Sequence, residues 1–207
     1  MLSRRLLLLS LAGGLAGCSS LRRPLPSMEF LGDLTEIYAG YRDRARGNSM
    51  PSRKEAVRPP SLMRQGVPYK GDESPGTILV STSERRLYLI LDEGMATVYP
   101  VGVGKAGKQW QGRTEIDGAY VEPAWAPTSD IRRDNPSLPD LIPGGAPENP
   151  MGARVLTLSG GKYAIHGTNR PESIGTYASY GCVRMFNEDV IDLFRRVGVG
   201  TPVIVAT

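Results

Sequence analysis

The chain has 207 residues, of which 40% are hydrophobic, so its length and composition suit one medium-sized globular domain with extensions. The formal net charge is +4, but the excess lies in residues 1–72, which hold 12 Lys and Arg against 6 Asp and Glu, whereas residues 73–207 hold 13 against 15. Because the second part has no basic patch interleaved with aromatic residues, the composition argues against a nucleic-acid-binding protein.

The first twenty residues, MLSRRLLLLSLAGGLAGCSS, have the pattern of an export signal. Two arginines precede an apolar run of about twelve residues, which is too short to span a bilayer of roughly 30 Å as a helix. The ending LAGC resembles a bacterial lipobox, in which the cysteine is lipidated and becomes the first residue of the mature protein. We therefore expect a signal peptide at 1–17 and a lipid anchor at Cys18.

Such an anchor would hold the protein on the periplasmic side of a bacterial membrane, and Ser19 after the cysteine favours the outer membrane. The alternative is an ordinary secretory signal, with Cys18 removed by cleavage elsewhere. Arg4 and Arg5 leave both general and twin-arginine export open. If Cys18 carries lipid, Cys182 has no partner and is a free thiol, because the chain has two cysteines.

Residues 18–75 are expected to tether the domain to the anchor. Residues 28–45 have loosely helical apolar spacing, which predicts a short helix. Residues 46–76 are polar and rich in Pro, Gly, Arg and Ser, so they cannot bury enough apolar surface to offset the entropy of ordering. The composition therefore predicts a linker, followed by a domain over residues 76–207.

The domain is predicted to be mainly β. The runs TILVST and RRLYLILD are rich in β-forming residues, and Leu87, Leu89 and Leu91 alternate, which indicates a hairpin with one buried face. Further strands are expected in four segments: MATVYPVGVG, EIDGAYVEPAW, ARVLTLS and KYAIHG.

One short helix is predicted after Cys182, followed by a closing strand in TPVIVAT. Asn187 is a candidate cap for this helix, and Gly198 marks its end. The Pro- and Gly-rich stretch between Trp125 and Met151 is too long for an ordinary connection, so we expect a flap over the functional site.

Cys182 and His166 are the candidate reactive pair. Cys182 follows Gly181 in a predicted turn, where the backbone N–H groups of Tyr180, Gly181 and Cys182 would form an oxyanion hole. His166 ends a predicted strand, and an imidazolium beside the thiol would lower its pKa. Arg184 would strengthen the positive field and bind a carboxylate. The alternatives are a buried structural cysteine and a surface arginine.

A metal or cofactor is not expected, because a single histidine without cysteine pairs argues against a zinc site and no nucleotide-binding fingerprint is present.

The segment AIHGTNRPESIGTYASYGCVRMFNEDV closely resembles the signature of the L,D-transpeptidase catalytic domain family, of the YkuD type. Three further segments resemble family motifs in the expected order: YPVGVGKAGKQWQGRTEIDG, EPAWAPT and GGAPENPMGARVLTL. The likeness covers roughly residues 76–207. It implies a β-sandwich-like domain that acts on the stem peptides of bacterial peptidoglycan.

The resemblance also implies roles for individual residues. Cys182 would be the nucleophile and His166 the general base and acid. The remaining implied roles are shaping of the turn by Ser179 and Gly181, substrate binding by Arg184, and lining of the site by Tyr163 and Gly167.

Two departures from the family pattern are visible. The family often has a second histidine immediately before the Gly-Cys pair, where this chain has Tyr180, so a second proton-carrying side chain is absent there. A Thr-Pro pair usual in the family is replaced by Arg113, Thr114 and Glu115, which affects the local turn rather than the chemistry.

The resemblance predicts acyl transfer from a tetrapeptide stem to an amine. The acceptor would be another stem, giving 3-3 cross-links, or an envelope protein. One alternative is a hydrolase on the same scaffold, an L,D-carboxypeptidase or amidase, because water also cleaves a thioester. The second alternative is a non-catalytic lipoprotein that binds the cell wall.

Overall fold

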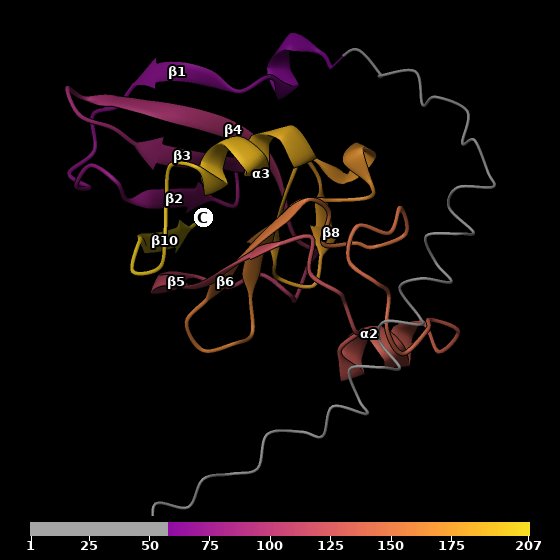
Figure 1. The fold of residues 1–207 in the computed structure, drawn as a ribbon. Helices are drawn as coiled ribbons and strands as arrows, with labels where there is room; N and C mark the ends of the chain where they lie inside the picture. The colour runs from indigo at the N-terminus through magenta and orange to yellow at the C-terminus, as the bar shows by residue number, and fades with distance from the viewer. Residues whose placement is uncertain (1–57) are drawn as a thin grey trace, which may run out of the picture. The chain divides into compact units, whose positions relative to one another are not determined.

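The computed structural model describes residues 58–207, so the expected signal peptide, Cys18 and the predicted helix at 28–45 lie outside the described residues. Figure 1 shows the strands β1, β4, β3, β2 and β10 stacked in that order, with β5 and β6 continuing the sheet. In the described part of the chain, no helix is both long and apolar enough to cross a membrane.

The described residues contain ten strands and four short helical elements. The strands are β1 (Gln65–Pro68), β2 (Ile78–Ser81), β3 (Arg86–Ile90), β4 (Met95–Gly104), β5 (Gly112–Val121), β6 (Arg154–Leu158), β7 (Ala164–His166), β8 (Tyr177–Ser179), β9 (Val183–Met185) and β10 (Pro202–Ala206). The helices are the 3-10 turns η1 (Pro60–Leu62) and η2 (Pro171–Ser173) and the α-helices α2 (Ser129–Asp134) and α3 (Asn187–Phe194). The prediction of a mainly β domain with one short helix after Cys182 is confirmed, and α2 is an additional six-residue helix.

The sheet closes on itself around β4. Its order is β1-β4-β3-β2-β10-β5-β6-β7-β9, and β9 pairs again with the C-terminal half of β4, as does β8. A strand of ten residues is long enough to join β1 and β3 at one end and β8 and β9 at the other. The two strands that flank Cys182 are therefore both attached to β4.

The core fills the inside of this closed sheet. The predicted hairpin forms between β2 and β3, with Leu87 and Leu89 buried, while Leu91 lies beyond β3 and is only partly buried. The core consists of Ile78, Val80, Leu87, Leu89, Tyr99, Val101, Val103, Ile116, Leu156, Leu158, Ile165, Val183, Met185, Val190, Leu193, Val203 and Val205.

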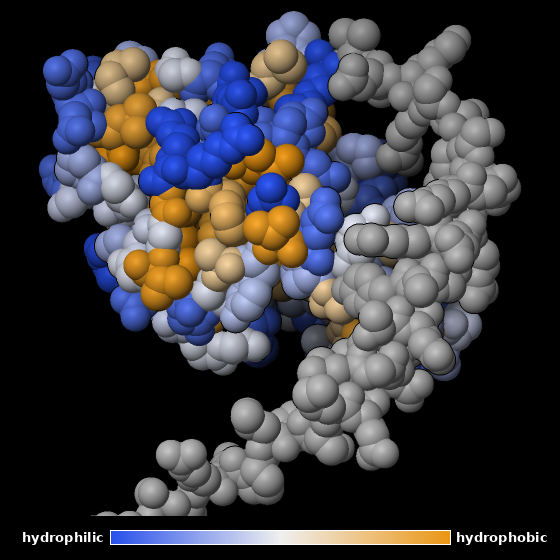
Figure 2. All heavy atoms as spheres, viewed as in Figure 1, coloured by the Kyte–Doolittle hydropathy of each residue, from blue (hydrophilic) through white to orange (hydrophobic). Residues whose placement is uncertain are grey.

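Helix α3 contacts β6 and β7 and contributes Val190 and Leu193 to the core. Figure 2 shows apolar side chains at the centre of the face that carries α3 in Figure 1, with hydrophilic side chains toward its margins. Phe194 and Val197 are only partly buried against the core, and Val199 is exposed. The core residues themselves are buried, so the apolar surface that stays accessible on this side lies outside the core.

Secondary structure is also present before the domain boundary predicted at residue 76. Strand β1 pairs antiparallel with β4, and η1 precedes it, so the described part of the predicted linker is structured. The Arg58 guanidinium stacks on Phe186 at 3.7 Å and pairs with Asp189 at 3.0 Å and with Glu188. Composition did not predict this ordering, because the contacts that offset its entropy come from residues more than a hundred positions away.

We expect Arg58→Ala to lower the free energy of unfolding by about 2 kcal/mol, because removing one partner of a buried pair leaves an uncompensated charge. The Asp189 side chain is only 3% exposed, and burial raises its pKa. Arg64 also approaches Asp189, at 3.5 Å, but its side chain is 41% exposed. Arg64→Ala is therefore the matched control, with an expected loss below about 1 kcal/mol. Equal losses in urea unfolding of the two variants would contradict a special role for Arg58.

Candidate active site

Cys182 lies in a short turn between two strands that pair with β4. Strand β8 runs parallel to the end of β4, with Ser179 opposite Gly104, and β9 pairs antiparallel with β4 just before that point. The turn predicted before a helix is therefore a turn between strands, and β9 separates Cys182 from α3. Cys182 is a free thiol with intermediate exposure.

The hydroxyl of Ser179 fixes this turn from inside. It donates a hydrogen bond to the Cys182 carbonyl at 2.6 Å and accepts one from the Gly181 N–H at 3.1 Å. The Ser179 carbonyl accepts from the Lys105 N–H at 2.9 Å, which ties the turn to the end of β4. Because the Gly181 amide is already bonded to Ser179, the predicted oxyanion hole is left with the amides of Tyr180 and Cys182.

Position 181 can hold only glycine, because of its backbone conformation and its close neighbours. Its φ is +115°, and a Cβ at this position would lie 2.4 Å from a ring carbon of Tyr163. Tyr163 stacks on Trp110 with ring centroids 4.7 Å apart, and the Trp110 Nε1–H donates to the Gly181 carbonyl at 3.0 Å. Tyr163, which was predicted to line the site, therefore packs against the turn that carries Cys182.

The structure brings His166, Arg184 and Cys182 onto one face of two neighbouring strands. Strands β7 and β9 are parallel, with Ile165 opposite Val183 and His166 opposite Arg184. Cys182 directly precedes β9, and its thiol bonds with the Ala164 backbone and interacts with the Arg184 charge, while Ile165 and Val183 belong to the core. His166 is thus beside Arg184 and diagonal to Cys182 across the strand pair.

The imidazole of His166 is buried, with 4% of its surface exposed. Its Nδ1–H donates to the Gly167 carbonyl at 2.7 Å, because a carbonyl can only accept. The neutral ring then carries its basic lone pair on Nε2. This tautomer suits a base that takes a proton from a neighbouring thiol.

Burial keeps both members of the pair neutral. Desolvation, with a smaller contribution from the Arg184 charge, lowers the pKa of His166 from 6.5 to about 4, although the Gly167 and Pro150 carbonyls act in the opposite direction. Burial raises the pKa of the Cys182 thiol, although Arg184 and a bond with the Ala164 backbone favour the thiolate. Burial therefore argues against the expected imidazolium in the free protein, because it disfavours the charged form of both groups.

Arg184 is held between β7 and β4. Burial lowers the pKa of its guanidinium, and the Cys182 thiol acts in the opposite direction. Gly102 faces it on β4, where a Cβ would lie 2.7 Å from the Ser173 carbonyl and 3.5 Å from the Arg184 Cβ. The glycine leaves room for the arginine, whose charge is available to a substrate carboxylate or developing oxyanion.

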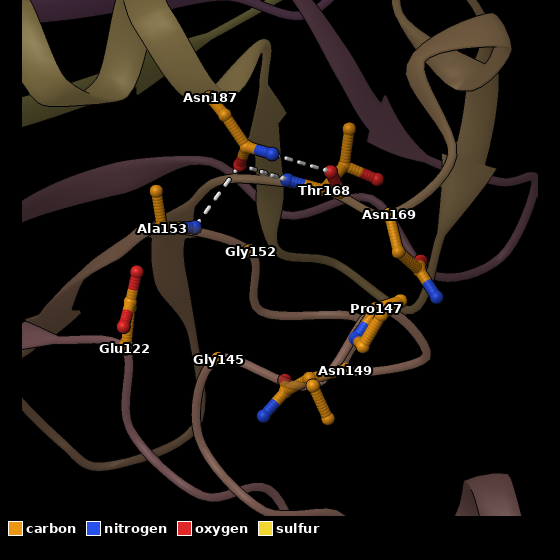
Figure 3. A pocket seen from close by; sticks show the side chains of 10 residues that line it. Glu122, Gly145, Pro147, Asn149, Gly152, Ala153, Thr168, Asn169 and Asn187 are labelled. Atoms are coloured by element: carbon orange, nitrogen blue, oxygen red, sulfur yellow. Dashed lines mark hydrogen bonds between the residues drawn. The ribbon is translucent and has the colours of Figure 1, made fainter. Parts of the chain in front are cut away.

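Asn187 connects the end of β7 with α3, a role that the sequence did not predict. Its Oδ1 accepts from the N–H groups of Ala153 and Thr168 at 3.0 and 3.1 Å, and its Nδ2 donates to the Thr168 carbonyl at 3.1 Å, as Figure 3 shows. Phe186 stands at the N-cap and the Asn187 side chain makes no cap bond, so the expected capping role is wrong. Gly167 lies against Asn187, where a Cβ would be 2.2 Å from Oδ1.

A polar cavity of about 200 Å³ lies beside these bonds. Asn149 on its wall is buried, donating to the Pro123 and Pro143 carbonyls at 2.9 Å and accepting from the Met151 N–H at 2.9 Å. In the sequence, the Asn-Pro pair in GGAPENP was the only pattern that indicated a role for Asn149. The lining residues, shown in Figure 3, are Glu122, Gly145, Ala146, Pro147, Asn149, Gly152, Ala153, Thr168, Asn169 and Asn187.

The predicted flap segment contacts the cysteine turn. Helix α2 belongs to this segment, and the Tyr180 hydroxyl donates to the carboxylate of Asp134 at its end.

Across residues 58–207, no group of three or more His, Cys, Asp or Glu side chains is placed to hold a metal ion.

A model of the L,D-transpeptidase catalytic domain, YkuD, matches residues 75–205. The chain belongs to this family. It is 40% identical over 135 residues to "Probable L,D-transpeptidase ErfK/SrfK" of Escherichia coli strain K12, and 40% identical over 136 residues to "Probable L,D-transpeptidase YbiS" of the same strain. These matches cover 61% of this chain but only 42% and 43% of the relatives, so the chain spans less than half of their length.

Solved structures support the fold. An L,D-transpeptidase from Mycobacterium smegmatis has a TM-score of 0.51 at 16% identity, covering 63% of this chain and 58% of that one. The C442S mutant of an Enterococcus faecium L,D-transpeptidase also has a TM-score of 0.51 at 16% identity, covering 64% and 50%. The predicted L,D-transpeptidase fold is confirmed by this likeness.

The low pKa of His166 predicts how stability depends on pH. The unfolded chain protonates its histidine near pH 6.5 and the folded chain near pH 4, so stability is lost as pH falls through this window. The loss from this residue amounts to about 3 kcal/mol. In His166→Gln, which does not titrate there, urea unfolding should show a correspondingly smaller loss between pH 6.5 and pH 4. Parallel stability curves for wild type and variant would contradict a buried neutral imidazole.

Proposed function

We propose that this protein is a peptidoglycan L,D-transpeptidase that works through a Cys182 thioester. The observation that carries the proposal is the placement of Cys182, His166 and Arg184 on one face of β7 and β9, in a domain of the L,D-transpeptidase family. The donor would be a tetrapeptide stem, cleaved between its diamino acid and the terminal D-alanine.

The reaction starts from a neutral pair. As the Cys182 sulfur attacks the carbonyl carbon, its proton moves to Nε2 of His166, and the amides of Tyr180 and Cys182 stabilise the oxyanion. The imidazolium then gives this proton to the leaving D-alanine amine, the C–N bond breaks, and a thioester remains. Nε2 next accepts a proton from the acceptor amine as it attacks the thioester. The C–S bond then breaks, and the imidazolium returns this proton to the Cys182 sulfur, which restores the thiol.

The acceptor amine is proposed to belong to a second stem, which yields a 3-3 cross-link, or to an envelope protein. Acyl transfer to an amine is supported by the family model and by the relatives, which are named as L,D-transpeptidases. Hydrolysis by water at the same thioester would give tripeptides instead of cross-linked products.

We expect Cys182→Ala to abolish turnover and His166→Gln to lower it by at least about a thousandfold. The two residues act as one catalytic unit, so loss of either removes most of the contribution of both. The full-length protein is incubated with purified tetrapeptide muropeptides, and the products are resolved by mass. Dimers that have lost one D-alanine indicate transpeptidation, whereas tripeptides alone would favour the hydrolase. Cross-linking by Cys182→Ala at the wild-type rate would disprove the proposal, and circular dichroism checks that each variant is folded.

We further propose that Cys18 carries lipid and holds the protein at the periplasmic face of the outer membrane. The support is the LAGC ending of the short apolar run, followed by Ser19. Cys18→Ala should move the protein from the membrane fraction to the soluble fraction, while Ser20→Ala, which leaves LAGC intact, should not. An unchanged distribution of Cys18→Ala between fractions would show that another feature retains the protein.

A further inference from the structure

Beside the cysteine turn, two lysines are paired with carboxylates of the flap helix α2. Lys108 Nζ lies 3.0 Å from Asp130, and Lys105 Nζ lies 3.6 Å from Asp134. Both ammonium groups also face the ring of Tyr180, at 4.1 Å for Lys105 and 5.8 Å for Lys108. Two cations and one aromatic ring thus form a surface on which the carboxylates of α2 lie.

The lysines are part of the rigid surroundings of Cys182. The Lys108 N–H donates to the Lys105 carbonyl at 2.9 Å, which closes the turn after β4, and the Lys105 N–H donates to Ser179. The Lys108 carbonyl lies close to Gly181, since a Cβ there would be 3.0 Å from it. The main chain that carries the two cations is therefore fixed against the residues that carry the thiol.

The carboxylates come from a more loosely attached element. Helix α2 has six residues, contributes no buried side chain, and lies in the long segment between Trp125 and Met151. The four paired side chains are between 37% and 49% exposed, and such exposed ion pairs contribute little net stability. Arg133 also pairs with Asp130 at 3.1 Å, so this carboxylate keeps a partner if Lys108 is taken by another anion.

We propose that Lys105 and Lys108 form a binding site for a carboxylate of the peptide substrate, and that Asp130 and Asp134 occupy this site in the free protein. Substrate binding would exchange one carboxylate for another and release α2 from the cysteine turn. The choice of a peptide carboxylate as ligand rests on the proposed function, because a stem peptide ends in one. Tyr180, at the position where the family often has histidine, is a positioning residue whose ring orients both ammonium groups.

The test uses the reactivity of Cys182 in the full-length protein rather than turnover. Iodoacetamide, a neutral reagent, alkylates the thiol with loss of iodide, and mass spectrometry of the peptide that contains Cys182 gives the rate. N-acetyl-D-alanine, which has a carboxylate, is added as a competitor, and N-acetyl-D-alanine amide is the neutral control. We expect the acid to slow alkylation of the wild type and the amide to have no effect.

The variants should shift this protection in opposite directions. In Lys105→Gln/Lys108→Gln, the acid concentration for half protection should rise about tenfold, because two charge-assisted contacts are lost. In Asp134→Asn, it should fall about threefold, because the competing internal carboxylate is removed. Asp140→Asn and Arg132→Gln are matched controls in the same segment, since these residues pair with each other at 2.9 Å and away from the lysines. Both should protect like wild type.

Protection that is equal for acid and amide, or that is unchanged in the lysine variant, would overturn the proposal. A decrease of protection in Asp134→Asn would overturn the exchange of carboxylates. Misfolding cannot produce the expected pattern, because Asp134→Asn is expected to improve protection while the lysine variant weakens it. Protection as expected, together with no product from muropeptides, would refute the proposed function and leave the carboxylate site standing.

Discussion

The hydroxyl of Ser179 is the contact on which the geometry of the site depends. One oxygen binds the Gly181 amide and the Cys182 carbonyl, and the Ser179 carbonyl is held by the end of β4. Its side chain is buried, so these bonds do not compete with water. Because β8 and β9 both pair with β4, the turn has little freedom at either end. The fold therefore fixes the direction of the thiol before any substrate arrives.

Desolvation, rather than charge pairing, decides the protonation state of this site. His166 and Cys182 share one face with Arg184, whose positive charge favours a thiolate and disfavours an imidazolium. Burial outweighs the effect of Arg184 on the Cys182 thiol and adds to its effect on the His166 imidazole. Both groups are therefore neutral in the free protein. A neutral thiol is a weak nucleophile and is also less prone to oxidation, which depends on thiolate character. In the proposed reaction, the thiol would therefore lose its proton to His166 during attack rather than before it.

The residues of the site could be predicted from sequence because they lie in local motifs, whereas their supports could not. Cys182, His166 and Arg184 lie within nineteen consecutive positions, and a turn and a strand explain their placement. The support from Trp110 comes from 71 positions before Gly181, and Arg58 reaches Asp189 across 131 positions. Contacts between residues so far apart in the chain leave no periodic or compositional pattern in the sequence. The pKa values were also beyond sequence reasoning, because they follow from burial that only the packed fold defines.

The turn that carries Cys182 and the neighbouring helix α2 are held by different kinds of contact. The turn that carries Cys182 rests on buried hydrogen bonds and on the stacked Trp110 and Tyr163, all of which are lost together if the sheet opens. Helix α2 rests on exposed ion pairs and one tyrosine hydroxyl, which exchange readily with water and with other anions. The contacts of α2 therefore contribute less net stability than the buried bonds of the turn. Since α2 contributes no residue to the core, the bonds that fix the cysteine turn do not depend on this helix.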